Sequence, residues 1–224
     1  TKAKRICEEV GNSKTLSIVY MNMASLYSIF CEHIKSPEFM DEAVRMYRMS
    51  FKLACKNKRW DIVCNTFCNL TDLDQDFSHV DKYKDVVASF AKLKIPKEIP
   101  LYKYSMLRYL AVKAYIDKKP ALATAYLIKS VDKIDDKVSP EAWKAQALNL
   151  TASIYMKRNM PDSALVFINR IFDAPYGYWG NDVKANAYKM LHTIYTIKGE
   201  KGKAQEAYGK MLIMRDSLFN IDNL

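Results

Sequence analysis

The stretch "AYKMLHTIYTIKGEKGKAQEAYGKM", residues 187–211, contains two amphipathic patterns separated by a turn at Gly199. Apolar residues recur every three or four positions on both sides of this glycine, which is typical of two helices that each bury one face. Its anchor residues, at offsets 0, 3, 7, 16 and 20, are Tyr188, Leu191, Tyr195, Ala204 and Tyr208.

The same frame recurs upstream. The preceding pair of patterns matches at offsets 0, 7, 16 and 20 through Leu148, Tyr155, Ala164 and Ile168. Counting back from Ala204, the equivalent positions follow in steps of 40, 41, 40 and 40 residues: Ala164, Ala123, Tyr83 and Ala43. Because self-similarity at such a period is the signature of a repeat protein, we expect five helical hairpins in one register.

The composition agrees with a helical repeat array. Gly (6) and Pro (7) are both scarce, which argues against an all-β fold with many turns. Small residues fall where paired helices must approach closely, as in Ala111 with Ala123 and Ala152 with Ala164. Pro120 and Pro161 occupy the same repeat position at the start of second helices, and Ser139-Pro140-Glu141 reads as an N-cap followed by proline.

These residues resemble the tetratricopeptide repeat family, whose pattern of a bulky residue, Leu, a small residue and Tyr, followed by Ala and an aromatic residue, is matched best in the last hairpin. The resemblance implies an all-α fold, a right-handed α-solenoid of about five hairpins, over residues 13 to 218. A HEAT-type array is the rival, and the Tyr-to-Ala spacing favours the tetratricopeptide pattern. Three departures stand out: about seven extra residues around Pro37, Asp74 with Tyr83 in the second hairpin, and His192 where the family prefers a small residue.

The expected organisation is a single array over residues 1–224. Residues 1–12 read as a trailing half-hairpin that stops at Gly11 and Asn12. The hairpins are expected at 13–57, 58–96, 98–136, 139–174 and 180–218, and residues 219–224 begin a connector.

No cluster of residues predicts a reaction. Cys64 and Cys68 share a helix face, but zinc usually needs four ligands and no second pair is present, so small apolar packing is the preferred interpretation. His33, His79 and His192 are isolated, and Asp135 with Asp136 suits a solvated loop. The aromatic cluster in residues 174–181 is read first as a packing plug and second as a binding lip. We therefore expect no catalytic residue, no metal and no small-molecule cofactor.

The first helix of each hairpin forms the inner face of a solenoid, so the register predicts which side chains line a groove. Taking offsets −2, +1 and +5, the polar candidates for peptide binding are Asn65, Asp72, Ser105, Arg108, Gln146, Asn149, Asn186, Lys189 and Thr193. Asn and Gln amides both donate to and accept from an extended backbone, and Arg or Lys can hold carboxylates. The expected partner is a protein or peptide segment, bound without catalysis.

The net charge of +10 supports an alternative, which is binding of nucleic acid or another polyanion. No Lys/Arg run exceeds three residues, so Lys-rich helices that keep the protein in solution are the preferred explanation, and nucleic acid is not the favoured partner.

The tail "DSLFN", residues 216–220, resembles the junction of bacterial repeat-containing signalling regulators. In that family the array leads through a coiled coil to a histidine kinase or a helix-turn-helix output domain. The resemblance implies a sensor portion, extracytoplasmic (periplasmic) rather than cytoplasmic, of a membrane-anchored regulator of signal transduction or transcription. Self-association through the C-terminal connector is a further expectation.

Overall fold

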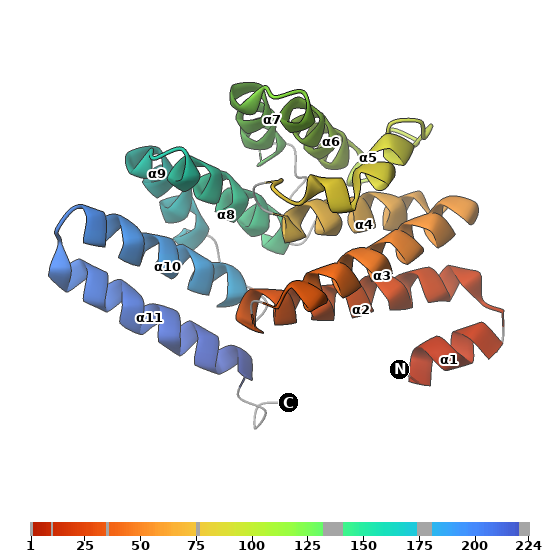
Figure 1. Cartoon of the computed structure of the whole chain (residues 1–224), viewed down its shortest axis with the longest axis horizontal. Coiled ribbons are helices and arrows are strands. Elements are labelled where there is room, and N and C mark those ends of the chain that lie inside the picture. Colours follow the sequence, from red (N-terminus) through yellow and green to blue (C-terminus); the bar gives the residue numbers. More distant parts are fainter. Residues whose placement is uncertain are drawn as a thin grey trace. The chain divides into compact units, whose positions relative to one another are not determined.

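The computed structural model describes residues 2–9, 11–34, 36–74, 77–131, 141–173 and 181–219. These residues form eleven α-helices and one 3₁₀ turn, with no strand among them, which confirms the predicted all-α class (Figure 1). The chain divides into two compact units, unit 1 (residues 1–126) and unit 2 (residues 127–224).

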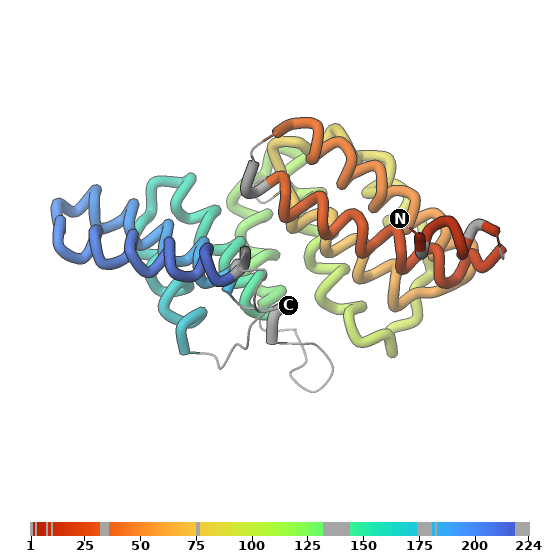
Figure 2. Tube along the Cα trace, turned by 90° about the horizontal axis from the view of Figure 1, so that it is seen from below, coloured from red at the N-terminus to blue at the C-terminus, as the bar shows by residue number. Residues whose placement is uncertain are grey.

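Unit 1 contains most of the helices. In chain order they are α1 (Lys2–Glu9), α2 (Ser13–Ile34), α3 (Pro37–Lys56), α4 (Trp60–Leu73), the 3₁₀ turn η1 (Val80–Lys82), α5 (Lys84–Phe90) and α6 (Tyr102–Ile116), followed by α7 (Pro120–Val131), which crosses the unit boundary. The α2 and α3 helices lie side by side and form the most extensive pair of this unit (Figures 1 and 2). The α4 helix packs on α3 and also on α6.

Unit 2 contains two complete hairpins. They are α8 (Glu141–Lys157) with α9 (Pro161–Phe172), and α10 (Asn181–Ile197) with α11 (Lys201–Phe219). Figure 1 shows α10 and α11 joined by a tight turn, and α10 also contacts both α8 and α9. The first helices of the two hairpins, α8 and α10, are therefore neighbours.

One tight turn recurs between paired helices. Lys118, Asn159 and Gly199 have positive φ angles of 57°, 57° and 73°. After each of them a backbone N–H reaches back five residues, with N···O distances of 2.8 to 2.9 Å: Lys119 to Ala114, Met160 to Tyr155, and Glu200 to Tyr195. The left-handed residues are 41 and 40 residues apart, so the sequence register has a backbone counterpart.

The alanines of the repeat lie in the core. Ala24, Ala43, Ala111, Ala152 and Ala164 are fully buried, as a position where two helices approach closely requires. A larger side chain at such a site would push the helices apart, because a packed core has no free volume.

The extra residues around Pro37 do not separate the two helices by a long loop, since α2 ends at Ile34 and α3 begins at Pro37. The α2 and α3 helices are instead longer than the others, with 22 and 20 residues. Ser36 has extended backbone angles and Pro37 occupies the first turn of α3, a combination that starts a helix abruptly. The insertion therefore lengthens the first hairpin.

The helix stop after α1 lies at Gly11 and Asn12, as the sequence pattern predicts. Gly11 adopts a φ of 67°, and the Asn12 N–H donates to the Cys7 carbonyl at 3.0 Å. This is the left-handed closure that glycine permits at a helix end.

Asp74 and Tyr83, the two residues by which the second hairpin departs from the repeat pattern, contact each other. Tyr83 Oη donates to Asp74 Oδ2 at 3.1 Å, and the His79 backbone N–H donates to the same oxygen at 3.0 Å. Tyr83 is fully buried and Asp74 is 2% exposed. The second hairpin therefore replaces a regular second helix with a turn organised around a buried carboxylate, followed by the short α5.

His192, which stands where the repeat pattern prefers a small residue, makes a specific contact. Its Nδ1 lies 3.0 Å from the Ala204 carbonyl oxygen on the partner helix, and its ring centroid lies 5.3 Å from that of Tyr208. The imidazole therefore links α10 to α11.

Several predicted features lie outside the described residues. They are the Ser139-Pro140 start signal, the carboxylates at 135 and 136, residues 174–180 of the aromatic cluster, residues 220–224 of the tail, and the side chains of His33, Leu218 and Phe219.

The Asp74–Tyr83 contact leads to a first prediction. Tyr83→Phe removes one hydrogen bond to a buried carboxylate, so it should lower the free energy of unfolding by about 1.5–3 kcal/mol. Urea denaturation followed by circular dichroism measures this. Tyr115→Phe is the control, because Tyr115 is 36% exposed, and it should change stability by less than about 0.5 kcal/mol. Equal effects of the two variants would contradict the assigned role of Tyr83.

Candidate functional site

In unit 1 the predicted groove residues lie between α4 and α6 and not on an open face. Ser105 and Arg108 are fully buried, and the Asp72 side chain is 17% exposed. The expectation that Ser105 and Arg108 line an accessible groove is thereby corrected. The neighbouring first helices pack so closely that the row predicted to face a ligand contacts the protein itself.

Arg108 is the largest fully buried side chain and is held by α4. Its Nη2 lies 2.5 Å from Asp72 Oδ1. The Nη2 and Nε atoms also donate to Thr71 Oγ1, at 2.9 and 3.2 Å. The Thr71 hydroxyl can accept both because its own hydrogen goes to the Cys68 carbonyl, at 2.9 Å. The predicted carboxylate-binding arginine therefore binds a carboxylate of its own chain.

The buried pair perturbs the titration of its neighbours. Burial raises the pKa of the Asp72 carboxyl, and the Arg108 guanidinium opposes this shift. Burial alone would lower the pKa of Arg108, but Asp72 and Tyr104 reverse this, so the net pKa is raised and the guanidinium stays charged. Burial also raises the pKa of Tyr104, with the Asp72 charge adding to the effect.

The remaining candidate of unit 1, Asn65, is half-buried on α4, and its Oδ1 accepts a hydrogen bond from Asn69 Nδ2 at 3.2 Å. This pair is four residues apart on one helix. Asn65 therefore has a local partner.

In unit 2 the predicted positions are more accessible. Lys189 and Thr193 are exposed, and Gln146 and Asn186 are half-buried. They lie on the neighbouring helices α8 and α10, which Ser153 Oγ and Met190 Sδ join at 3.6 Å. The structure thus keeps a polar surface on these helices.

Asn149 is the exception on this surface. It is 5% exposed, and its Oδ1 has no hydrogen-bond partner among the described residues. A buried amide oxygen without a partner costs about 1–3 kcal/mol. The oxygen atom is itself buried, so a bound molecule can donate to it only after neighbouring side chains move.

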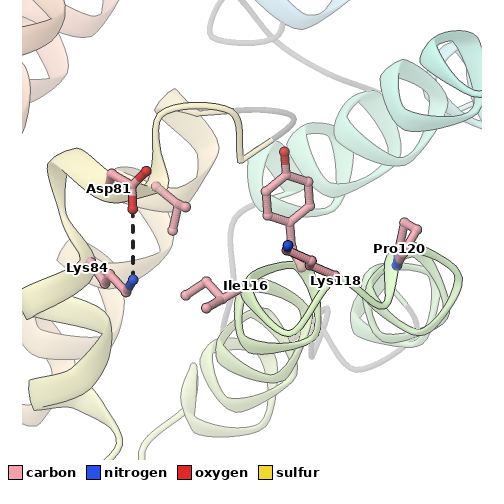
Figure 3. Close-up of a pocket in the computed structure, with 7 residues that line it drawn as sticks. Asp81, Lys84, Ile116, Lys118 and Pro120 are labelled. Atoms are coloured by element: carbon pink, nitrogen blue, oxygen red, sulfur yellow. Dashed lines mark ion pairs between the residues drawn. The ribbon is translucent and has the colours of Figure 1, made fainter.

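A pocket that the sequence did not predict lies in unit 1. It has a volume of about 550 Å³. One wall, from η1 and α5, contributes Val80, Asp81 and Lys84, and the other wall, from the end of α6 and the start of α7, contributes Tyr115, Ile116, Lys118 and Pro120. Figure 3 shows Asp81 and Lys84 facing Ile116 and Lys118 across the opening. The one sequence signal near it was the irregular second hairpin.

Buried residues next to the pocket support the Tyr115 ring in its wall. The Phe77 ring, 2% exposed, meets the Tyr115 ring edge to face at a centroid distance of 5.6 Å and an angle of 66°. The Arg108 guanidinium lies 6.0 Å from the centroid of the same Phe77 ring. Phe77 also has a φ of 60°, a left-handed conformation that costs a non-glycine residue about 1–2 kcal/mol. These two contacts therefore help to hold a strained residue in place.

Side chains of α3 hold the pocket wall that η1 and α5 form. Arg48 Nη2 donates to the Lys82 carbonyl at 2.6 Å and to Asp85 Oδ1 at 2.8 Å, and Lys82 Nζ pairs with Asp41. These groups are partly exposed, so each pair contributes little stability, but together they fix the position of η1 relative to α3.

Cys64 and Cys68 are buried, and burial favours their protonated thiols. Burial raises the pKa of Cys64 to about 11 and that of Cys68 well above its ordinary value. Within the described ranges, no three His, Cys, Asp or Glu side chains are grouped to hold a metal ion. None of the helices in those ranges combines the length and apolar character that a membrane span requires.

Comparison with known proteins gives no family: the sequence matches no protein-family model and no curated protein.

The buried pair leads to a second prediction. Arg108→Met leaves the Asp72 charge without its partner and should lower the free energy of unfolding by about 3–5 kcal/mol. Adding Asp72→Leu removes that charge and should recover a large part of the loss. The exposed Arg45–Glu42 pair, 2.6 Å apart, is the control, and Arg45→Met should cost less than about 1 kcal/mol.

Chemical denaturation of the four proteins measures these differences. A double variant as unstable as Arg108→Met alone would contradict the account, because it would mean that packing and not charge pairing sets the cost.

Proposed function

We propose that this chain is a tetratricopeptide-repeat module that binds an extended peptide along α8 and α10 and performs no reaction of its own. The solenoid arrangement is part of this proposal. It is supported by the common register of the hairpins and by the turn that recurs after 41 and 40 residues.

The observation that carries the proposal is the unpartnered Oδ1 of Asn149. A peptide backbone N–H that reached this buried oxygen after a local rearrangement would satisfy it. The half-buried amides of Gln146 and Asn186 could both donate to and accept from the same peptide. Extended peptides need such partners because their own backbone groups are not paired.

Lys189 adds a charge to this surface. It is exposed on α10 and three residues from Asn186, so both side chains lie on one helix face. An ammonium there would favour a peptide with an acidic side chain or a free carboxylate. Salt dependence separates this from general polyanion binding, since counterion release from nucleic acid weakens affinity steeply as salt rises.

The placement of this module in a signalling regulator belongs to the proposal as well. It rests on the resemblance of residues 216–220, of which 216–219 continue α11. The sensor role, the extracytoplasmic position and self-association through the connector stay predictions.

The test is selection of random 12-residue peptides on the full chain, followed by affinity measurements on the enriched sequences. Asn149→Ala should weaken the selected peptides about ten-fold or more, the loss of one good hydrogen bond. Lys189→Ala, at an exposed position, should weaken them about two- to five-fold. Asn169→Ala and Lys201→Ala, both at exposed positions elsewhere in unit 2, are the controls and should bind as the unmodified chain does.

Stability provides a second readout. Asn149→Leu should unfold at an equal or higher urea concentration, because it removes a buried acceptor that has no partner. Peptides that bind Asn149→Ala and Lys189→Ala with undiminished affinity would reject the proposal.

A further inference from the structure

We propose that the 550 Å³ pocket between η1–α5 and the α6–α7 turn is a second recognition site, for a peptide segment in which an aromatic residue is flanked by acidic residues. This site lies in unit 1 and shares no residue with the surface on α8 and α10. It goes beyond the proposed function and does not depend on it.

The size and lining of the pocket fit an aromatic side chain. Binding sites for organic groups usually span about 300–1,000 Å³, and the pocket falls inside that range. Val80, Ile116 and Pro120 supply apolar surface. The Tyr115 ring is 36% exposed, so part of it remains available for stacking against a second ring.

The Tyr115 ring is also held in advance of binding. Phe77 contacts it edge to face. Phe77 in turn lies next to the Arg108 guanidinium and belongs to the turn in which Asp74 accepts the His79 backbone N–H. A ligand therefore does not have to order this wall of the pocket, and preorganisation of this kind improves affinity.

The charges of the pocket select for acidic flanking groups. Lys84 Nζ is 3.9 Å from Asp81 Oδ1, a long and exposed pair that largely neutralises one lysine (Figure 3). Lys118, across the opening, forms no ion pair with any of the residues that the structure describes. The site thus has one unbalanced positive charge at its mouth, in a chain whose net charge is +10.

The exposed rim favours a peptide over a free small molecule. Asp81, Lys84, Lys118 and Pro120 are all exposed, so an occupant keeps much of its surface in water. A binding pocket usually buries about 70–90% of the surface of a small ligand. A side chain that enters while its backbone stays outside suits this shape better.

The experiment uses the full chain and fluorescein-labelled SGDFDGS, measured by fluorescence anisotropy. Binding is expected with a Kd on the order of 100 µM, as for a single anchored side chain. The peptide SGDADGS, which lacks the aromatic ring, should bind at least five-fold more weakly. Lys118→Glu should weaken SGDFDGS about ten-fold, whereas Lys119→Glu should stay within about two-fold.

The Lys118 and Lys119 variants are a matched pair, since both change an exposed lysine of the same turn by the same charge and Lys119 does not line the pocket. Equal losses in the two variants would overturn the proposal, because general attraction to a basic surface would explain them. Tyr115→Ala should remove the difference between SGDFDGS and SGDADGS. The two lysine variants decide the case whatever the stability of Tyr115→Ala.

Two further outcomes are decisive. Displacement of SGDFDGS by 3-phenylpropionate at a concentration equal to that of the peptide itself would show a small-molecule site and reject the peptide. Asn149→Ala should bind SGDFDGS normally, so a failure of this proposal is distinguishable from a failure of the proposed function.

Discussion

The burial of the Arg108 guanidinium is the constraint on which unit 1 depends. A charge with no exposure must be paired and hydrogen-bonded, because an isolated buried cation is too costly for a marginally stable domain. Asp72 and Thr71 meet part of this requirement from α4, and these contacts fix the register of α4 against α6. Arg108 Nη1 has no hydrogen-bond partner among the described residues. The same guanidinium covers Phe77, which supports Tyr115. One buried charge thus connects the packing of two helices to the wall of a surface pocket.

The two units use the same repeat position in different ways. In unit 1 the residue at offset +1 of the third hairpin is Arg108, and it binds Asp72 of the second hairpin. In unit 2 the corresponding residues are Asn149, whose carbonyl oxygen has no partner in the described part of the chain, and the exposed Lys189. The Arg108–Asp72 pair of unit 1 joins neighbouring hairpins, and our proposal assigns the polar groups of unit 2 to a bound peptide.

Much of the fold could be predicted because it depends on local rules. Helical periodicity predicted the helices, and Gly11, Gly199, Pro120 and Pro161 marked their ends, since glycine can adopt a positive φ and proline fixes φ at a helical value. The extra residues around Pro37 were recognised, but their lengthening of α2 and α3 was not predicted, because helical periodicity does not fix where one helix ends and the next begins.

The sites were harder to predict for a different reason. The Asp74–Tyr83 contact, the Arg108–Asp72 pair and the pocket join residues from separate helices, and their positions depend on how closely those helices pack. The register predicted that Asp72 and Arg108 both line the inner face and that Arg108 binds a ligand carboxylate, and it could not show that α4 and α6 pack over these residues. Exposure at a repeat position is a tertiary property, and the sequence pattern alone does not contain it.

Hydrogen–deuterium exchange on the full chain, with and without a peptide enriched by selection, tests most directly that the α8 and α10 surface binds a partner while the α4–α6 row serves the protein's own packing. The account predicts slower exchange on peptide addition in α8 around residues 146–153 and in α10 around 186–193, with the 65–72 and 105–112 segments already slow and unchanged. Protection that appears in 65–72 and 105–112, with α8 and α10 unaffected, would contradict it.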